Sequence, residues 1–173
     1  NISYFDTSID NQGGYRPEEY VDAISVTNEG ATVGWISAGE WLEYTIDVAT
    51  TGCYDIDLRY ASGNTNGGGP FYFEVDGLKV SPDIAFAYTG DWGIWNTKVS
   101  SIDLTEGIHI LRLVVTDGEF NLGRMTFSYN ALECEEPGSN TGLPFDFETT
   151  PVTSDFYNFD GGTATVEPVT VPQ

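Results

Sequence analysis

Hydrophobic and polar residues alternate in short runs between Val33 and Tyr129, and glycine-containing turns separate the runs. The stretches "EWLEYTIDV" (residues 40–48), "YDIDLRYAS" (54–62) and "FYFEVDG" (71–77) each place an apolar residue at every second position. This period of two is typical of a β-strand with one buried face, and no stretch shows the sustained 3.6-residue period of a helix. The sequence therefore predicts an all-β sandwich.

The same alternation predicts which aromatic residues face away from the core. Trp41 and Tyr72 fall on the polar side of their strands, and Glu74 shares the side of Tyr72. Successive side chains of a strand point to opposite faces, so these three residues are expected on an outer sheet face.

Two further tryptophans stand close together in "TGDWGIWNTKV" (residues 89–99). Trp92 lies in the glycine-rich turn, where we expect its ring to be exposed. Trp95 opens the strand "WNTKV" and is the better candidate for the core.

The composition changes near the end of the chain. "ECEEPGSNTGLP" (residues 133–144) combines acidic, glycine, serine and proline residues in the manner of a linker. We therefore expect one module over residues 1–135. Residues 136–173 are expected to be a linker with the truncated start of a following module, or a tail. Within the module, most of the chain between Thr7 and Gly30 is expected to be loop.

The charge of the chain narrows the classes of partner. Six lysine and arginine residues stand against 27 aspartate and glutamate residues, which leaves a formal net charge of −21. Such a surface disfavours nucleic acid and anionic membranes and repels sulfated or uronate-rich polysaccharides, so neutral ligands and divalent cations remain. No run of about 18 apolar residues appears, so no membrane-spanning segment is expected.

Few residues suggest catalysis. His109 is the single histidine, and its place in the apolar run "GIHILRLVV" is typical of a structural residue. One histidine makes no zinc cluster, and neither Cys53 nor Cys134 has a sequence partner that marks a nucleophile. The many carboxylates leave a glycosidase-like acid pair open. The two cysteines can form one disulfide or remain free thiols, and their spacing does not decide between these states.

Exposed rings in these positions favour a binding function. A pyranose carries a flat patch of C–H groups that packs against an aromatic face, and its hydroxyl groups need donors and acceptors such as Asn, Asp and Glu. An aromatic pair with an amide beside it therefore suits a sugar. A protein-interaction or structural β-sandwich module is the alternative class, and it predicts that the same rings are covered.

Six blocks of the chain occur in the order seen in one known family. "VGWISAGEWLEYTIDV", "GCYDIDLRYAS", "FEVDG", "TGDWGIWNTKV", "LTEGIHILRLVV" and "FNLGRMTF" resemble the family 6 carbohydrate-binding modules, and the resemblance extends from Tyr15 to Tyr129. It implies a noncatalytic jelly-roll β-sandwich of two antiparallel sheets, attached to a secreted glycoside hydrolase. The implied role is to hold that enzyme on a polysaccharide, which raises the local concentration of substrate.

The resemblance also implies a sugar site among the loops at one end of the sandwich. The tryptophan of "VGW" is Trp35 and the first tryptophan of "TGDWGIW" is Trp92, and these two rings would bracket one sugar. The asparagine of "FNL", Asn121, would bond its hydroxyl groups. An acidic residue of "EEYVD" would join them, with Asp22 the first match and Glu19 the second.

Some members of the family use a second cleft on the concave face of one sheet. The tryptophan of "GEWLEY" lies in that cleft, and here this residue is Trp41. Glu74 and Tyr72 are the residues that would join it.

The resemblance implies a structural calcium ion as well, without ligands that can be named. Asp6 and Asp10 are oxygen donors in a turn-rich loop, and a solvated loop is the simpler interpretation of both. Among glycans we favour a neutral β-glucan such as the β-1,3-glucan laminarin, followed by agar-type galactan and xylan. This order follows from the negative charge and from a general resemblance to modules of marine glycanases.

Overall fold

The computed structural model describes residues 4–131, 134, 152–155 and 164–165, and every regular element among them is a β-strand. The strands are β1 (Tyr4–Phe5), β2 (Ala23–Val26), β3 (Gly30–Val33), β4 (Trp41–Val48), β5 (Gly52–Ala61), β6 (Gly68–Val75), β7 (Leu78–Lys79), β8 (Ile84–Phe86), β9 (Asn96–Leu104), β10 (Gly107–Val115), β11 (Asn121–Asn130), β12 (Val152–Asp155) and β13 (Ala164–Thr165). These residues include no helix that is long and apolar enough to cross a membrane.

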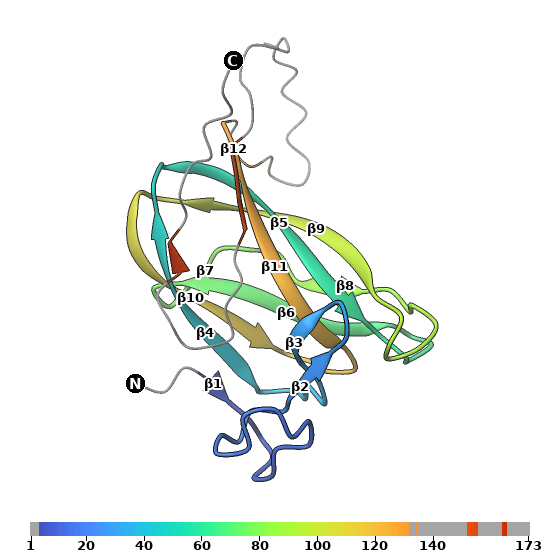
Figure 1. The fold of residues 1–173 in the computed structure, drawn as a ribbon. Helices are drawn as coiled ribbons and strands as arrows, with labels where there is room; N and C mark the ends of the chain where they lie inside the picture. Colours follow the sequence, from blue (N-terminus) through green and yellow to red (C-terminus); the bar gives the residue numbers. More distant parts are fainter. Residues whose placement is uncertain (1–3, 132–133, 135–151, 156–163, 166–173) are drawn as a thin grey trace.

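The strands form two sheets that lie face to face (Figure 1). The first sheet has the order β1-β4-β10-β6-β7, with β8 paired to β6 and β13 to β4. The second has the order β2-β3-β11-β5-β9, with β12 paired to β11. The pairs are antiparallel except that of β13 with β4. The predicted jelly-roll sandwich is confirmed.

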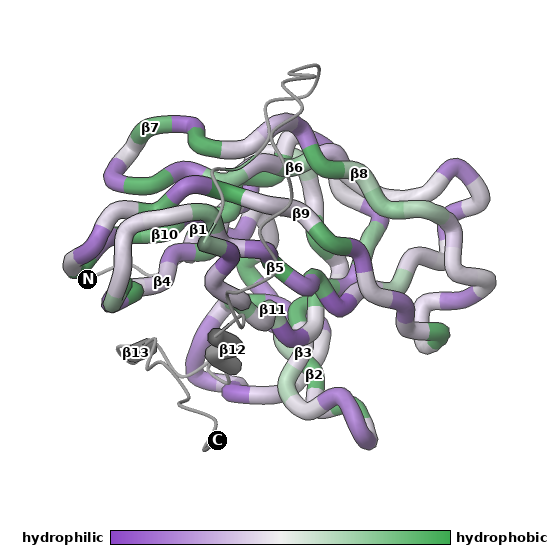
Figure 2. The backbone as a smooth tube through the Cα atoms, turned by 90° about the horizontal axis from the view of Figure 1, so that it is seen from above, coloured by the Kyte–Doolittle hydropathy of each residue, from purple (hydrophilic) through white to green (hydrophobic). Residues whose placement is uncertain are grey.

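The alternating apolar residues fill the space between the sheets. Figure 2 shows hydrophobic and hydrophilic positions following one another along the strands, which is the pattern that buries one face of each sheet. The largest fully buried side chains are Tyr54, Phe71, Phe73, Phe120, Ile46, Ile56, Leu58, Ile102, Leu111, Leu113, Leu122 and Val48. As predicted, Trp41, Tyr72 and Glu74 lie on the opposite face of their sheet from this core, between residues that pack inward.

Most of the chain between Thr7 and Gly30 is loop, as predicted, and the exception is β2, which forms a short hairpin with β3. Asn28 in its turn and Gly30 at the start of β3 take left-handed φ angles of 70° and 81°, which asparagine and glycine tolerate well. Each strand has only four residues, too few for the alternation to stand out in the sequence.

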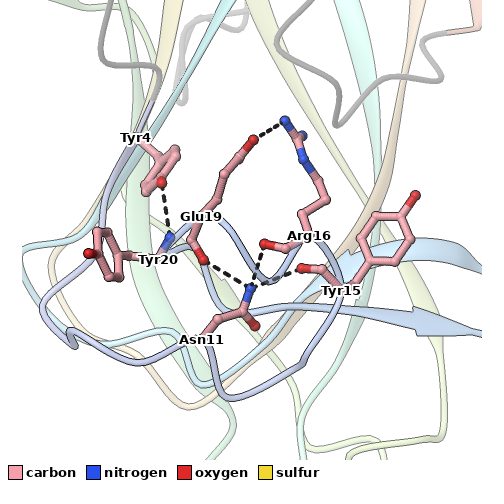
Figure 3. Close-up of polar contacts among 6 residues, drawn as sticks. All are labelled: Tyr4, Asn11, Tyr15, Arg16, Glu19 and Tyr20. Atoms are coloured by element: carbon pink, nitrogen blue, oxygen red, sulfur yellow. Dashed lines mark hydrogen bonds and ion pairs between the residues drawn. The ribbon is translucent and has the colours of Figure 1, made fainter.

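The loop before this hairpin is ordered by one side-chain amide (Figure 3). Nδ2 of Asn11 donates to the carbonyl oxygens of Tyr15, Arg16 and Glu19 at 2.9, 3.2 and 3.2 Å. The Tyr20 N–H donates to the hydroxyl oxygen of Tyr4 at 3.1 Å. These bonds close the loop on itself, so it holds a defined shape without regular structure.

Cys53 and Cys134 form a disulfide, which decides the question that their spacing left open. The bond ties the chain after β11 to the start of β5. The backbone N–H of Cys134 also donates to Oδ1 of Asp103 at 3.3 Å. The predicted boundary near Glu135 lies outside the described residues, as does most of the segment 136–173.

Candidate functional site

A pocket of about 540 Å³ opens at one end of the sandwich. Trp35, Trp92 and Trp95 form its aromatic walls, Ile24 and Val26 of β2 add an apolar side, and Ser37, Glu119 and Asn121 supply polar groups. Trp35 is 51% exposed and Trp92 43%. Two large apolar rings that remain open to water beside polar groups are typical of a ligand site.

Asn121 owes its position to the buried residue beside it. Phe120 is only 1% exposed and packs against Phe71 and Phe86, with ring centroids 5.4 and 5.1 Å apart. Phe120 thus anchors this segment in the core, and its neighbours Glu119 and Asn121 lie in the lining of the pocket.

Trp35 is held in the same way. Val33 and Ile36 on either side of it are 4% and 6% exposed, so the chain is anchored in the core before and after the ring. Trp35 has a φ of 51°, in the left-handed region that residues with a side chain rarely adopt. Backbone strain of this kind gathers at ligand sites, where other contacts hold it in place.

Trp92 lies in the loop between β8 and β9, which Figure 1 shows in yellow-green at the right of the sandwich. Thr89 pins this loop to the end of β5, because its N–H donates to the Ser62 carbonyl oxygen at 3.0 Å and its hydroxyl accepts from the Ser62 N–H at 3.0 Å. The Trp92 indole lies against Gly63, where a Cβ atom would come within 2.6 Å of Nε1.

Two hydrogen bonds join the loops that carry the pocket residues. Nδ2 of Asn121 donates to the Trp92 carbonyl oxygen at 2.9 Å, which leaves Oδ1 as an acceptor for a ligand. The hydroxyl of Ser62 donates to the Glu119 carbonyl oxygen at 2.8 Å. Ser62 is fully buried and connects the Trp92 loop to the Glu119 loop. The sequence analysis did not identify Ser62. The feature that could have indicated it is a small polar residue directly after an apolar strand.

Trp95 does not join the core as the sequence suggested. It is half-buried, precedes β9 and lines the pocket with the other two tryptophans. The pattern around "WNTKV" misled because the residues of β9 from Asn96 to Val99 are all exposed, so the strand begins outside the core.

Asp22 lies beside the pocket rather than in its lining. Its side chain accepts hydrogen bonds from the Gln12 N–H and from the Ser8 hydroxyl, and its carbonyl oxygen accepts from the Gly34 N–H at 2.9 Å. Burial raises the pKa of its carboxyl group and outweighs the Gln12 N–H, which lowers it. Asp22 thus supports the residue before Trp35 through its backbone. Glu19 is engaged in an ion pair with Arg16.

The residues of the second predicted cleft do come together on the outer face of the first sheet. Trp41 and Tyr72 lie in one row across β4, β10 and β6. A cation covers each ring: the guanidinium carbon of Arg112 lies 4.5 Å from the Trp41 ring centroid, and Nζ of Lys79 lies 4.4 Å from that of Tyr72. Arg112 also approaches Glu74 at 3.9 Å.

The described residues show no cluster of free carboxylates that would identify a calcium site. Both carboxylate oxygens of Asp6 accept backbone N–H bonds, from Ser8 and Asp22. The one group of three close acidic, cysteine or histidine donors among them is Cys53, Asp103 and Cys134, and its two cysteines are already spent in the disulfide. Calcium stays a prediction of the resemblance, and Asp10 contributes a backbone carbonyl to its loop.

The fold and the pocket together define a β-sandwich binding module whose rings and amide suit a flat ligand with a polar rim. The chain matches carbohydrate binding module (family 6) over residues 7–129 and belongs to this family. The family consists of noncatalytic carbohydrate-binding modules.

Solved modules share both fold and sequence with this chain. The module of lichenase 5A from Cellvibrio mixtus, solved with cellotriose, is 34% identical with a TM-score of 0.54, and the match covers 61% of this chain and 82% of that one. The C-terminal module of a marine laminarinase from Zobellia galactanivorans is 27% identical with a TM-score of 0.56, covering 61% and 85%.

A curated relative is much longer than this chain. The exo-β-D-glucosaminidase of Amycolatopsis orientalis is 35% identical over 91 residues, which are 51% of this chain and 9% of that enzyme. The chain thus spans less than a tenth of this relative's length.

Proposed function

We propose that the pocket binds the end of a polysaccharide and holds one sugar ring between Trp35 and Trp92. The main support is that two half-exposed indoles and Asn121 line one pocket in a member of a carbohydrate-binding family. Each indole offers an apolar face for the C–H groups of the sugar, and Oδ1 of Asn121 accepts from a hydroxyl. One sugar makes few contacts, so we expect a dissociation constant in the range of roughly micromolar to millimolar.

Among neutral glycans, the favoured ligand is a β-1,3-glucan such as laminarin. The net charge of −21 disfavours anionic glycans, and a similar module comes from a laminarinase. The similar module solved with cellotriose supports a β-glucan more generally. Agar-type galactan and xylan are the alternatives, because no described contact selects one hydroxyl orientation over another.

The module would act as the noncatalytic anchor of an extracellular glycoside hydrolase. A relative that contains a similar segment is named as a glycosidase, and the Cys53–Cys134 disulfide fits an oxidising compartment. Holding the enzyme on its polysaccharide raises the effective concentration of substrate at the catalytic domain.

The test is tryptophan fluorescence titrated with laminarin, agarose and xylan oligosaccharides, on the natural sequence and on Trp92→Ala. We expect a saturable change with one glycan that is lost in Trp92→Ala, because the ring is exposed and its removal leaves the core intact. Circular dichroism of the variant controls for folding. Absence of a response to every glycan would overturn the proposal and favour a protein-interaction module.

A further inference from the structure

Glu119 is the one charged side chain among the described residues that line the pocket. It lies at the surface, directly before the buried Phe120 and two residues before Asn121. In the described part of the chain its carboxylate has no hydrogen bond or ion pair, and only its backbone carbonyl is engaged. The pocket therefore presents a carboxylate that the protein itself does not neutralise.

The backbone holds Glu119 in place from both sides. The Ser62 hydroxyl donates to its carbonyl oxygen at 2.8 Å. The preceding residue, Gly118, accepts a hydrogen bond from the Gly69 N–H at its carbonyl oxygen, at 2.7 Å. It also packs closely against Ile36, because a Cβ atom on Gly118 would lie 2.0 Å from the Ile36 carbonyl oxygen. This close packing leaves the Glu119 backbone little freedom, so its side chain starts from a fixed point in the lining of the pocket.

The conformation of Glu119 is unfavourable for its residue type. Its φ is 69°, in the left-handed region where glycine or asparagine would be less strained. Folding alone therefore gives no reason for glutamate at this position. Trp35 shares this property, and both residues line the same pocket. Strain that is retained at a site points to a role in binding.

The surroundings add to the negative potential at the pocket. Asp91 and Asp117 lie in the loops that carry Trp92 and Glu119, and their carboxylates accept N–H bonds from Gly93 and Gly118. No lysine or arginine occurs among the described lining residues. Indole walls exclude water from part of the pocket, so a charge there acts more strongly than in open solvent.

We propose that this pocket prefers a sugar that carries a protonated amino group, with the Glu119 carboxylate as acceptor and counter-ion of that group. The inference rests on the proposed function, because the same two rings must bracket the sugar. A neutral ring would still stack, and Glu119 would then accept only from a hydroxyl. An ammonium group in place of that hydroxyl forms a charge-assisted hydrogen bond, which is roughly twice as strong as a hydrogen bond between neutral groups.

The test compares three tetrasaccharides by isothermal titration calorimetry: a glucosamine oligomer, its fully N-acetylated form and laminaritetraose. The buffer is acidic enough to keep the amines protonated. The N-acetylated oligomer has the same rings and linkages without the charge. The proteins are the natural sequence, Glu119→Gln and Glu106→Gln. Glu106 lies in the turn between β9 and β10, at the end of β5 opposite the pocket, so its variant removes the same charge from the molecule elsewhere.

We expect the natural sequence to bind the glucosamine oligomer about ten to a hundred times more tightly than its N-acetylated form, as a charge-assisted bond implies. Glu119→Gln should remove this preference and weaken laminaritetraose binding by no more than about threefold, because the amide oxygen still accepts from a hydroxyl, while Glu106→Gln should keep the preference. The preference should also shrink as salt is added, because ions screen the exposed carboxylate. Glu119→Gly, which relieves the left-handed φ, provides a second variant in case glutamine perturbs folding, and it should lose the preference as well.

Other outcomes separate this inference from the proposed function. Equal binding of all three oligomers, or a preference that persists in Glu119→Gln and Glu119→Gly, would overturn the role of Glu119 and leave the sugar site standing. If Glu106→Gln reduces the preference for the glucosamine oligomer as much as Glu119→Gln does, the cause is a general attraction to an acidic protein. That result would also overturn the role of Glu119. If no oligomer binds and Trp92→Ala changes nothing, both proposals fail.

Discussion

At the level of single residues, the pocket depends on buried neighbours that aim exposed side chains outward. Phe120 and Ile36 are 1% and 6% exposed, and each directly precedes or follows a residue of the pocket. Gly63 works differently, because it makes room for the Trp92 ring by having no side chain. The positions of the exposed pocket side chains are therefore set by neighbours that anchor the chain in the core or leave room for a ring.

Gly63→Ala tests this role. Its Cβ would lie 2.6 Å from Nε1 of Trp92, and the half-exposed ring can swing away to make room. We expect the free energy of unfolding to change by less than about 1 kcal/mol. Glycan affinity should fall by about tenfold, since one stacking face is misplaced. Calorimetric titration and thermal unfolding measure the two effects, and an unchanged affinity would show that the Trp92 ring position does not matter.

At the level of elements, the single histidine, His109, lies near the start of β10. Both of its ring nitrogens lie close to oxygen atoms of neighbouring turns. Nδ1 of His109 lies 2.7 Å from Oδ2 of Asp76, and Nε2 lies 2.9 Å from the Thr105 carbonyl oxygen. The bond to Asp76 is the main cause that raises the pKa of His109. The predicted structural role of this residue is consistent with these contacts, which tie the turn after β6 to the turn before β10.

This arrangement predicts a pH dependence of stability. Because the pKa of His109 is higher in the folded protein, its stabilisation is fully present below the unfolded value of about 6.5 and is lost as the pH rises through the folded value. The free energy of unfolding should therefore decrease over that window. The chain has no other histidine, so His109→Gln should remove the decrease. Urea unfolding at a series of pH values measures it, and a flat natural profile would contradict the assignment.

The carboxyl group of Asp76 predicts a second pH effect, on the acidic side of the same profile of stability against pH. The Ile110 N–H and then His109 lower the pKa of its carboxyl group. A lowered folded pKa stabilises the protein above the unfolded value and is lost as the pH falls through the folded value. The same urea series, extended to acidic pH on Asp76→Asn, should show less acid destabilisation than the natural sequence.

At the level of the whole molecule, the disulfide and the pocket lie at opposite ends of the sandwich. Cys53 pairs with Asn130 at one end of β5 and β11, while Ala61 pairs with Asn121 at the other. The disulfide closes a loop with a sequence separation of 81 residues, which restricts the unfolded chain. Stability and binding should therefore respond separately to changes at the two ends.

Replacing both cysteines by serine should lower the free energy of unfolding by about 2–4 kcal/mol, mainly because the unfolded chain gains freedom. Glycan affinity should stay the same, because none of the pocket residues contacts the disulfide. Denaturant unfolding and calorimetric titration of the double variant measure the two quantities. A loss of binding in a variant that still folds would show that the two ends are coupled.

Calcium remains a prediction of the family resemblance. A chelator should therefore lower the midpoint of thermal unfolding, and added calcium should restore it. An unchanged midpoint would agree with the carboxylates of Asp6 and Asp22, which accept hydrogen bonds from the chain itself.

The sequence by itself determined the class of fold, the outward position of Trp41 and Tyr72, and the family. The fold class and the outward positions depend on the alternation of neighbours along a strand, and the family on six short blocks in a fixed order, and both are local properties of the sequence. It predicted correctly that Trp92 is exposed. It failed at Trp95, because a strand pattern does not show where the sandwich ends and the core stops.

Only the tertiary structure decided which residues meet. The pocket joins β2, the turn at Trp35, the loop at Trp92 and the start of β11, which are far apart in the sequence. It also placed Ser62 between two loops, closed Cys53 on Cys134 and brought Glu119 into the lining of the pocket. Distances between such segments follow from how the two sheets pack, and no local pattern of residues encodes them.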